Sequence, residues 1–202
     1  MGKREENRKR RAEDLLRAGL SLFLARGIEP VSIDDLTREA GMAKGNFYRY
    51  FPGKGELVEA LLAPMAGAAR TAMRRCAIAV GKAEDRPGLL EAYSRLALDL
   101  ASLGLAERDR VRLYLQEKRA PATPATATIR TLSDEMDTGA IALTDMAIGR
   151  QLLRVRDPRV SALAVVGAVE SLTLAYLSGR LDAPPAEVAQ IVVAMVMEGL
   201  AG

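Results

Sequence analysis

Residues 32–51 read SIDDLTREAGMAKGNFYRYF, and this stretch decides the fold of the N-terminal part of the chain. It opens with Ser32 and, three residues later, Asp35, a spacing typical of a capping box at the start of a helix. Gly41 follows the helical pattern, and glycine tolerates the positive φ of a tight turn. Apolar residues lie on both sides of that turn. Two short helices packed through them form a helix-turn-helix pattern: Leu36, Ala40, Met42, Phe47 and Phe51.

The second helix of this pattern, expected from residue 44 to residue 51, would enter the major groove of DNA. Asn can pair bidentately with adenine, and Lys or Arg can donate to guanine or to a phosphate. A glycine on the same face lets the backbone come close to the duplex. A helical hairpin with a solvated basic face is the alternative interpretation of the same spacing. The expected outer face consists of Lys44, Gly45, Asn46, Tyr48 and Arg49.

Positive charge is concentrated in the same part of the chain. Residues 1–54 contain 12 Lys/Arg and 8 Asp/Glu, whereas the formal net charge of the whole chain is +3. Such a basic N-terminal segment, called the basic head below, indicates nucleic acid or an anionic membrane surface as a partner. The basic arm from Arg4 to Arg11 is either a solvated tail or a non-specific phosphate contact.

The residue types that the chain lacks exclude several function classes. There is no histidine, which excludes His-based metal sites, catalytic triads and histidine general bases. The single cysteine, Cys76, fits a reducing compartment. It follows Arg74 and Arg75, cations that could lower its pKa for redox sensing, although a purely structural cysteine is the commoner case. We expect no metal site, no cofactor and no catalytic residue.

The rest of the chain predicts an all-α protein, because helix-forming residues dominate and no stretch alternates with period two. Gly27 and Pro30 end a first helix, and Asp85 and Asp157 are candidate N-caps. Further helices are expected at 54–81, 87–103, 105–119, 126–151, 158–179 and 185–200. Residues 1–53 would form a three-helix helix-turn-helix domain, and residues 54–202 a helical bundle for ligand binding and dimerisation.

Residues 10–60 resemble the DNA-binding domain of the TetR family of ligand-responsive regulators. The resemblance rests on Phe23 and Gly27, on Ser32, Ile33 and Leu36, on Ala40-Gly41, on Lys44-Gly45-x-Phe47-Tyr48-x-Tyr50-Phe51, and on Lys54 and Leu57. It implies a dimeric regulator, usually a repressor.

By position, the resemblance also implies roles for single residues. Ser32 would cap a helix and touch a phosphate, and Lys54 would neutralise another. Tyr50 would lie against the DNA backbone, and Lys44, Gly45, Asn46 and Tyr48 would be recognition contacts. Two departures stand out. Ala43 replaces the usual Ser or Thr cap, and Asp34 would repel a nearby phosphate, so no base contact is assigned to it.

The last two expected helices are apolar on more than one side, which predicts that a second copy of the chain covers them. The alternative is that both helices are core of one monomeric bundle. Pro64 would kink the helix that links the two domains and serve as a hinge. The sparse aromatic residues favour an apolar or amphipathic effector, with Met side chains lining a deformable cavity. Polar groups on otherwise apolar helices are the candidate ligand contacts: Tyr93, Tyr114, Gln116, Thr173 and Tyr176.

The sequence therefore predicts a cytoplasmic regulator that binds a palindromic operator as a homodimer and is released by a small molecule. The N-terminus is charged where a signal peptide would be apolar. The longest charge-free apolar run, residues 188–197, is shorter than the roughly 20 residues that span a bilayer, so no membrane partner is expected. The alternative is a helical cytosolic enzyme or binding protein whose basic head binds nucleic acid only non-specifically. Acidic and basic neighbours such as Glu117 and Lys118 are available to an enzyme, but at no meaningful spacing.

Overall fold

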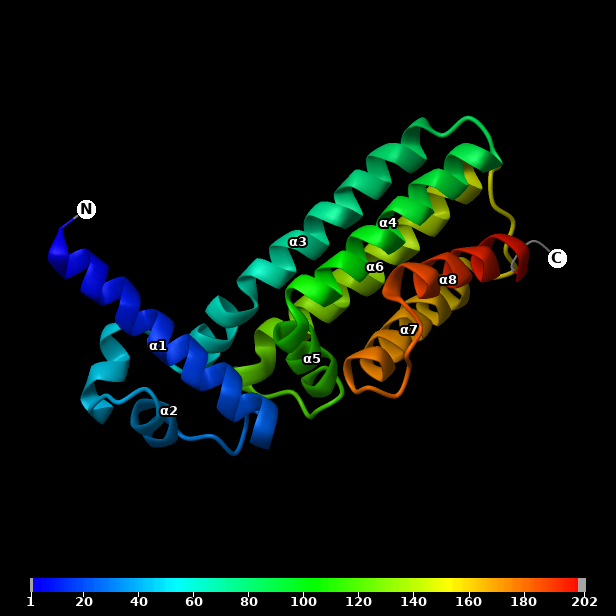
Figure 1. The fold of residues 1–202 in the computed structure, drawn as a ribbon. Coiled ribbons are helices and arrows are strands. Elements are labelled where there is room, and N and C mark those ends of the chain that lie inside the picture. Colours follow the sequence, from blue (N-terminus) through cyan, green and yellow to red (C-terminus); the bar gives the residue numbers. More distant parts are fainter. Residues whose placement is uncertain (1, 200–202) are drawn as a thin grey trace. The chain divides into compact units, whose positions relative to one another are not determined.

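The computed structural model describes residues 2–199, and these form helices joined by turns, with no strand among them (Figure 1). The prediction of an all-α chain is confirmed. The chain divides into two compact units. The N-terminal unit holds the residues up to Met65 together with Asp109–Leu132, and the C-terminal unit holds Ala66–Arg108 together with the residues from Ser133 onward. This grouping differs from a division of the sequence after residue 53, because residues 109–132 join the N-terminal unit.

The N-terminal unit contains the helix-turn-helix pattern. Its elements are α1 (Lys3–Arg26), α2 (Ile33–Glu39), the 3₁₀ helix η1 (Lys44–Arg49), the start of α3 (Lys54–Lys82), α5 (Arg108–Glu117), the 3₁₀ turn η2 (Pro124–Thr126) and the start of α6 (Ala127–Gly149). Burying a large apolar side chain stabilises the fold by roughly 1.5–3 kcal/mol. The largest fully buried side chains of this unit come from its helices, from η1 and from the loop after α1: Leu15, Phe23, Ile28, Leu36, Phe47, Leu57, Leu61, Leu62, Leu113, Ile129 and Leu132.

Local capping sets the helix boundaries that the sequence predicts. The Ser32 hydroxyl accepts a hydrogen bond from the Asp35 backbone N–H, and the Asp35 carboxylate accepts one from the Ser32 N–H, which completes the capping box of α2. Asp85 and Asp157 cap two later helices through backbone N–H groups. Gly27 ends α1 with a φ of 83°. These four predicted boundaries are confirmed.

The C-terminal unit is built from α4 (Arg86–Ala106), α7 (Pro158–Leu177), α8 (Pro185–Gly199) and the remaining parts of α3 and α6. Within it, α8 packs against both α4 and α7 (Figure 1). A buried cluster closes the end of this unit where α3 and α6 finish: Cys76, Val80, Leu89, Leu143, Ala147, Leu153, Val193 and Met197.

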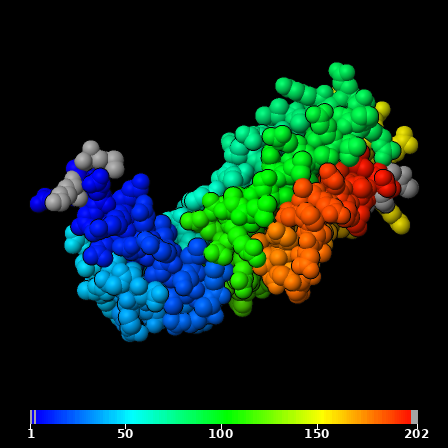
Figure 2. All heavy atoms as spheres, in the orientation of Figure 1, coloured from blue at the N-terminus to red at the C-terminus, as the bar shows by residue number. Residues whose placement is uncertain are grey.

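Helix α7 is apolar around most of its circumference. Its most apolar 18-residue window has a mean hydropathy of 1.8, enough by length and composition to cross a membrane, and 11% of that window is buried. Arg159 and Glu170 interrupt this helix, so its charge-free run, residues 160–169, is no longer than residues 188–197, and the helix reaches this hydropathy because so few of its residues are charged. Val160 is 65% exposed and Leu163 42% exposed, and the C-terminal helices form part of the visible surface (Figure 2). An apolar face of α7 is therefore open to a further partner.

Pro64 lies inside α3, which is helical from Lys54 to Lys82. Proline lacks the N–H that would bond the carbonyl four residues earlier, at Ala60. The division between the two units falls directly after Met65. The position of α3 that cannot donate a backbone hydrogen bond therefore lies next to the boundary between the two units.

Candidate functional sites

The turn between α2 and η1 is held by backbone hydrogen bonds and by a glycine. Gly41 has a φ of 63°, and its N–H donates to the Arg38 carbonyl at 3.1 Å. The Met42 N–H donates to the Thr37 carbonyl at 2.8 Å. Thr37 is buried next to the turn, and its hydroxyl donates to the Ile33 carbonyl at 3.0 Å. A threonine is therefore accommodated in this tight junction because its polar group is bonded within its own helix.

The segment expected to recognise DNA is a six-residue 3₁₀ helix, η1, in place of an α-helix. Three residues per turn place residues three apart in one row. Phe47 faces the core and is fully buried, with Tyr48 edge-on to its ring at 5.6 Å between centroids. Gly45 and Tyr48 form one outer row, and Asn46 and Arg49 form the other. Lys44, Gly45, Tyr48 and Arg49 are exposed and Asn46 is half-buried, although Lys44 lies three residues before Phe47, in the same row.

Lys44, the first residue of η1, forms an ion pair with Asp34 of α2. Its ammonium lies 2.9 Å from the Asp34 Oδ2 atom. The hydrogen bond and charge of Asp34 raise the pKa of Lys44. Ala43 provides no side-chain cap for η1, as the sequence predicts. A carboxylate of α2 therefore faces the uncapped start of η1.

Ser32 and Lys54, both expected at phosphates, already have partners within the protein. The Ser32 hydroxyl donates to the Asp35 carboxylate at 2.6 Å, and this hydrogen bond is the main cause of the lowered pKa of Asp35. The Lys54 ammonium donates to the carbonyls of Ile28, Glu29 and Val31 at 2.9, 2.9 and 3.1 Å. An ammonium has three N–H donors, so those of Lys54 hold the loop between α1 and α2. Tyr50 is half-buried at the end of η1.

Glu117 of α5 holds the same loop from another side and was not expected from the sequence. Its carboxylate accepts a hydrogen bond from the Ile28 N–H, while desolvation raises the pKa of Glu117. Its Oε1 atom lies 3.3 Å from the position that a Cβ would occupy on Gly27. The sequence around Glu117 and Lys118 does not indicate this role, because the partner, Ile28, lies far earlier in the chain.

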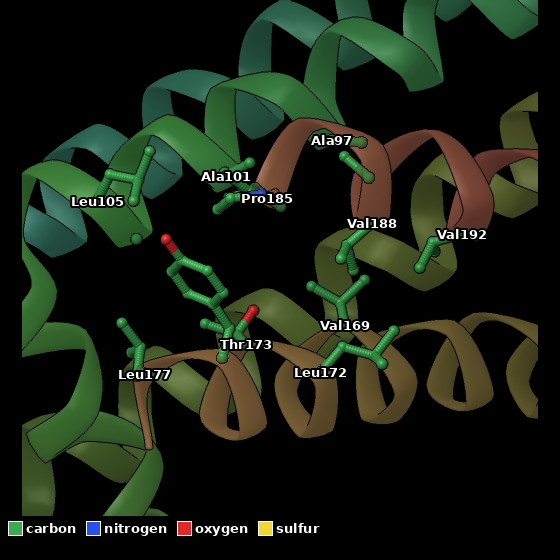
Figure 3. Close-up of a pocket in the computed structure, with 14 residues that line it drawn as sticks. Ala97, Ala101, Leu105, Val169, Leu172, Thr173, Leu177, Pro185, Val188 and Val192 are labelled. Carbon is green, nitrogen blue, oxygen red and sulfur yellow. The ribbon is translucent and has the colours of Figure 1, made fainter. Parts of the chain in front are cut away.

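A cavity of about 80 Å³ lies between α4, α7 and α8 in the C-terminal unit. Figure 3 shows Val169 pointing toward Val188, with Leu105 and Leu177 at the opposite end from Val192. Among the described residues that line it, the side chains with polar atoms are those of Thr173 and Tyr176, both predicted ligand contacts. The cavity therefore suits an apolar group.

The other predicted ligand contacts lie elsewhere. Tyr93 packs against the buried cluster of the C-terminal unit, where burial raises its pKa. Tyr114 is buried in the N-terminal unit, and Gln116 is exposed on α5. The sequence pattern identifies polar residues on apolar helices, but it does not show which helices surround a common space.

Cys76 is buried, and burial raises the pKa of its thiol to about 11. Its Sγ atom lies 3.7 Å from the Ala92 carbonyl. The neighbouring arginines therefore do not activate it. Within residues 2–199, no group of three or more Cys, Asp or Glu side chains is placed to hold a metal ion.

Comparison with known proteins relates the N-terminal unit to DNA-binding regulators. The family model described as "Bacterial regulatory proteins, tetR family" matches residues 15–61. The HTH-type transcriptional regulator SrpR of Pseudomonas putida is 37% identical over 59 residues, which are 29% of this chain and 26% of SrpR. The alignment thus spans about a quarter of that curated relative.

Solved structures resemble nearly the whole chain. A candidate fatty acid metabolism regulator of Clostridium perfringens has a TM-score of 0.74 at 19% identity, over 92% of this chain and 97% of that chain. The transcriptional regulator FadR of Bacillus subtilis, solved in complex with stearoyl-CoA, has a TM-score of 0.69 at 13% identity, over 93% and 98%. At these identities, the likeness shows a shared fold.

Proposed function

We propose that the chain, whose residues 15–61 match the model of the TetR family of bacterial regulatory proteins, is a cytoplasmic transcriptional regulator of that family, a repressor, that binds a palindromic operator as a homodimer. The observation that carries this proposal is the exposed side of η1. Lys44, Gly45, Tyr48 and Arg49 are all exposed there, on a segment anchored by the buried Phe47. Ammonium, guanidinium and phenol groups on such a surface, with the half-buried amide of Asn46 beside them, suit base edges and phosphates.

A homodimer would cover the apolar surfaces that the C-terminal unit leaves open. Val160 and Leu163 of α7 are exposed, and so are Ile191 and Met195 of α8, at 52% and 64%. Monomeric soluble proteins rarely expose large contiguous apolar patches. A two-fold dimer also fits the operator, because it can present two η1 segments about 34–36 Å apart to successive major grooves.

The effector would be amphipathic, with an aliphatic chain between α4, α7 and α8. Within residues 2–199, no charged side chain lines the cavity. The Arg108 guanidinium donates to the carbonyl of Leu177, one of those residues, at 3.0 Å. This places a cation next to that end of the cavity, where it suits an anionic head group. Ligand pockets usually enclose about 300–1,000 Å³, so binding requires these helices to separate.

A ligand would move α4, α7 and α8, and α3 would transmit this movement with Pro64 as the hinge. The spacing of the two η1 segments in the dimer would then change, and DNA would be released. A coupling free energy of about 1–3 kcal/mol is typical of allosteric proteins. The ligand of the Bacillus subtilis FadR structure, stearoyl-CoA, supports the choice of probe. We expect stearoyl-CoA to weaken operator binding, whereas coenzyme A alone has no effect because it lacks the chain.

Selection from random DNA duplexes tests the proposed function. The full chain is incubated with a random library at physiological salt, and bound duplexes are amplified and sequenced over several rounds. We expect enrichment of an inverted repeat, with binding at least about 10³-fold tighter than to scrambled DNA. Binding to all duplexes with a similar Kd of about 10⁻⁴–10⁻⁶ M is non-specific and would contradict the proposal.

The N-terminal turns of α1 would add phosphate contacts. Arg4, Arg8, Lys9 and Arg10 are exposed, and the first fully buried residue of α1 is Leu15. A variant without residues 1–9 should fold as before. Its log Kd should depend less steeply on log salt, by about 0.9 for each phosphate that the arm neutralises in the full chain. An unchanged slope, measured by titrating the selected duplex at several salt concentrations, would exclude this role.

A further inference from the structure

The ion pair between Asp34 and Lys44 connects the two helices of the helix-turn-helix. Asp34 lies in the first turn of α2, and Lys44 is the first residue of η1. The Asp34 and Lys44 side chains are 46% and 63% exposed, and the ammonium lies 2.9 Å from the carboxylate. The pair is therefore formed at the surface by residues from two different elements.

Asp34 has a different role from its neighbour Asp35. The Asp35 carboxylate bonds the backbone and hydroxyl of Ser32, and Arg38 and Arg26 lie 3.6 and 3.9 Å from it. Asp34 instead reaches across the turn to η1. A cation at the start of a helix is unfavourable because the backbone N–H groups there carry partial positive charge. Asp34 provides the opposite charge at that place.

The donors of Lys44 suggest what this pair does on DNA. An ammonium has three N–H donors, and Asp34 occupies one of them. Two remain, which matches the two major-groove acceptors of guanine, O6 and N7. A phosphate that approached Lys44 would meet the carboxylate of Asp34 at the same time, and two negative charges at short range repel each other.

We propose that Asp34 is a positioning residue for DNA recognition, which holds Lys44 for guanine and keeps it from binding phosphates at any sequence. This inference rests on the proposed function, and it attributes part of the protein's selectivity for one DNA sequence to the Asp34 carboxylate. Phosphates occur at every position of a duplex, so a free Lys44 would strengthen binding to all DNA. With Asp34 present, Lys44 strengthens binding chiefly where guanine lies below it.

The test compares Asp34→Asn with the unaltered protein on two duplexes, the sequence selected from random DNA and its scrambled form. We expect the Kd for the scrambled duplex to fall by about two- to fivefold, as for an exposed ion pair. Its salt slope should steepen by about 0.9, which corresponds to one phosphate. The Kd for the selected duplex should change less, so the ratio of the two affinities falls. Asp34→Glu, which keeps the carboxylate, should restore the ratio.

Glu39→Gln is the matched control. Glu39 is exposed on the same helix, and no ion pair to it is found among residues 2–199. This change removes the same charge without freeing Lys44, so it should leave the affinity ratio unchanged. In the background Lys44→Gln, adding Asp34→Asn should no longer steepen the salt slope, because the cation has been removed.

The outcomes separate this inference from the proposed function. If random duplexes yield no preferred sequence, the proposed function fails whatever Asp34 does. If the protein selects a sequence but Asp34→Asn keeps both the ratio and the salt slope, the inference is overturned. A purely structural role would lower the melting temperature of Asp34→Asn and weaken binding to both duplexes equally, which would also overturn it.

Discussion

Cys76 illustrates at the level of a single residue how burial overrides neighbouring charge. A thiolate beside arginines would be reactive, but the Cys76 thiol lies inside the C-terminal unit, with a pKa raised from 9.0 to about 11. Raising the pKa favours the protonated thiol, so at pH 8 the native protein should hold about a hundredfold less thiolate than the unfolded chain.

The corresponding prediction is slow labelling of native Cys76 by a disulfide reagent at pH 8. Because this is the only cysteine, absorbance of the released thiolate reports on one site. We expect labelling at least about a hundredfold slower than in denaturant. The folded state should also become less stable as pH rises above about 9 toward 11, since the unfolded thiol ionises first. Native labelling at the denatured rate would show that the thiol is accessible.

Residue pairs could be predicted from the sequence when both partners are close along the chain. Ser32 and Asp35 are separated by less than one helical turn, so the spacing of a capping box identifies both of them. Gly41 lies at the turn between two short helices, where a glycine is expected. Lys54 and its carbonyl partners are far apart in the sequence. Nothing in the sequence near Lys54 indicates those partners, and a basic residue after a recognition helix is equally suited to a phosphate.

At the level of elements, the loop between α1 and α2 connects the DNA-binding motif to α3 and α5. Lys54 at the start of α3 bonds three of its carbonyls, and Glu117 at the end of α5 bonds the Ile28 N–H. Gly27 lies next to that carboxylate in a conformation with positive φ. The position of α2 therefore depends on two helices that the sequence places outside the first 53 residues.

Replacing Lys54 by Met tests this arrangement, because Met has similar length and no donors. We expect the free energy of unfolding to fall by about 1–3 kcal/mol, since three carbonyls no longer receive a charged donor. The salt slope of operator binding should stay the same. Lys82→Met, at the exposed end of the same helix, should change neither. A slope reduced by about 0.9 in Lys54→Met would instead support the phosphate contact that the family resemblance implies.

Most helices could be predicted from the sequence, but the 3₁₀ type of η1 and the neighbours of each helix could not. Caps at Asp85 and Asp157 set the starts of α4 and α7. The 3₁₀ character of η1 was not predicted, because so short a segment gives too little periodicity to separate it from an α-helix. Helix α7 is apolar on several sides, so its sequence does not show which side faces the cavity.

At the level of the whole molecule, the residues of α7 divide between two opposite faces. Val169, Leu172 and Tyr176 line the cavity. On the other side, Val160 and Leu163 are exposed, and Gly167 continues their row at helical spacing. A Cβ built on Gly167 meets no atom within 4 Å. Glycine therefore occupies a position where the chain itself has room for a larger side chain.

We predict that Gly167→Leu separates folding from dimerisation. Leucine is favoured over glycine in a helix by about 1 kcal/mol, and there is open space around it, so a monomer would become more stable. A partner helix packed closely against Gly167 would instead clash with leucine, so the dimer should dissociate at higher protein concentration than before. Sedimentation equilibrium measures this constant, and chemical denaturation measures the stability.

Gly67→Leu provides the control, because Gly67 is a helical glycine that, like Gly167, has no atom within 4 Å of its Cβ position. It should stabilise the helix without changing the dimer constant, since it lies on α3, away from the apolar faces of α7 and α8. Gly167→Leu should also weaken binding to the full inverted repeat far more than to a half-site, because only the full site requires two joined η1 segments. An unchanged dimer constant in Gly167→Leu would mean that this face of α7 is not the dimer interface.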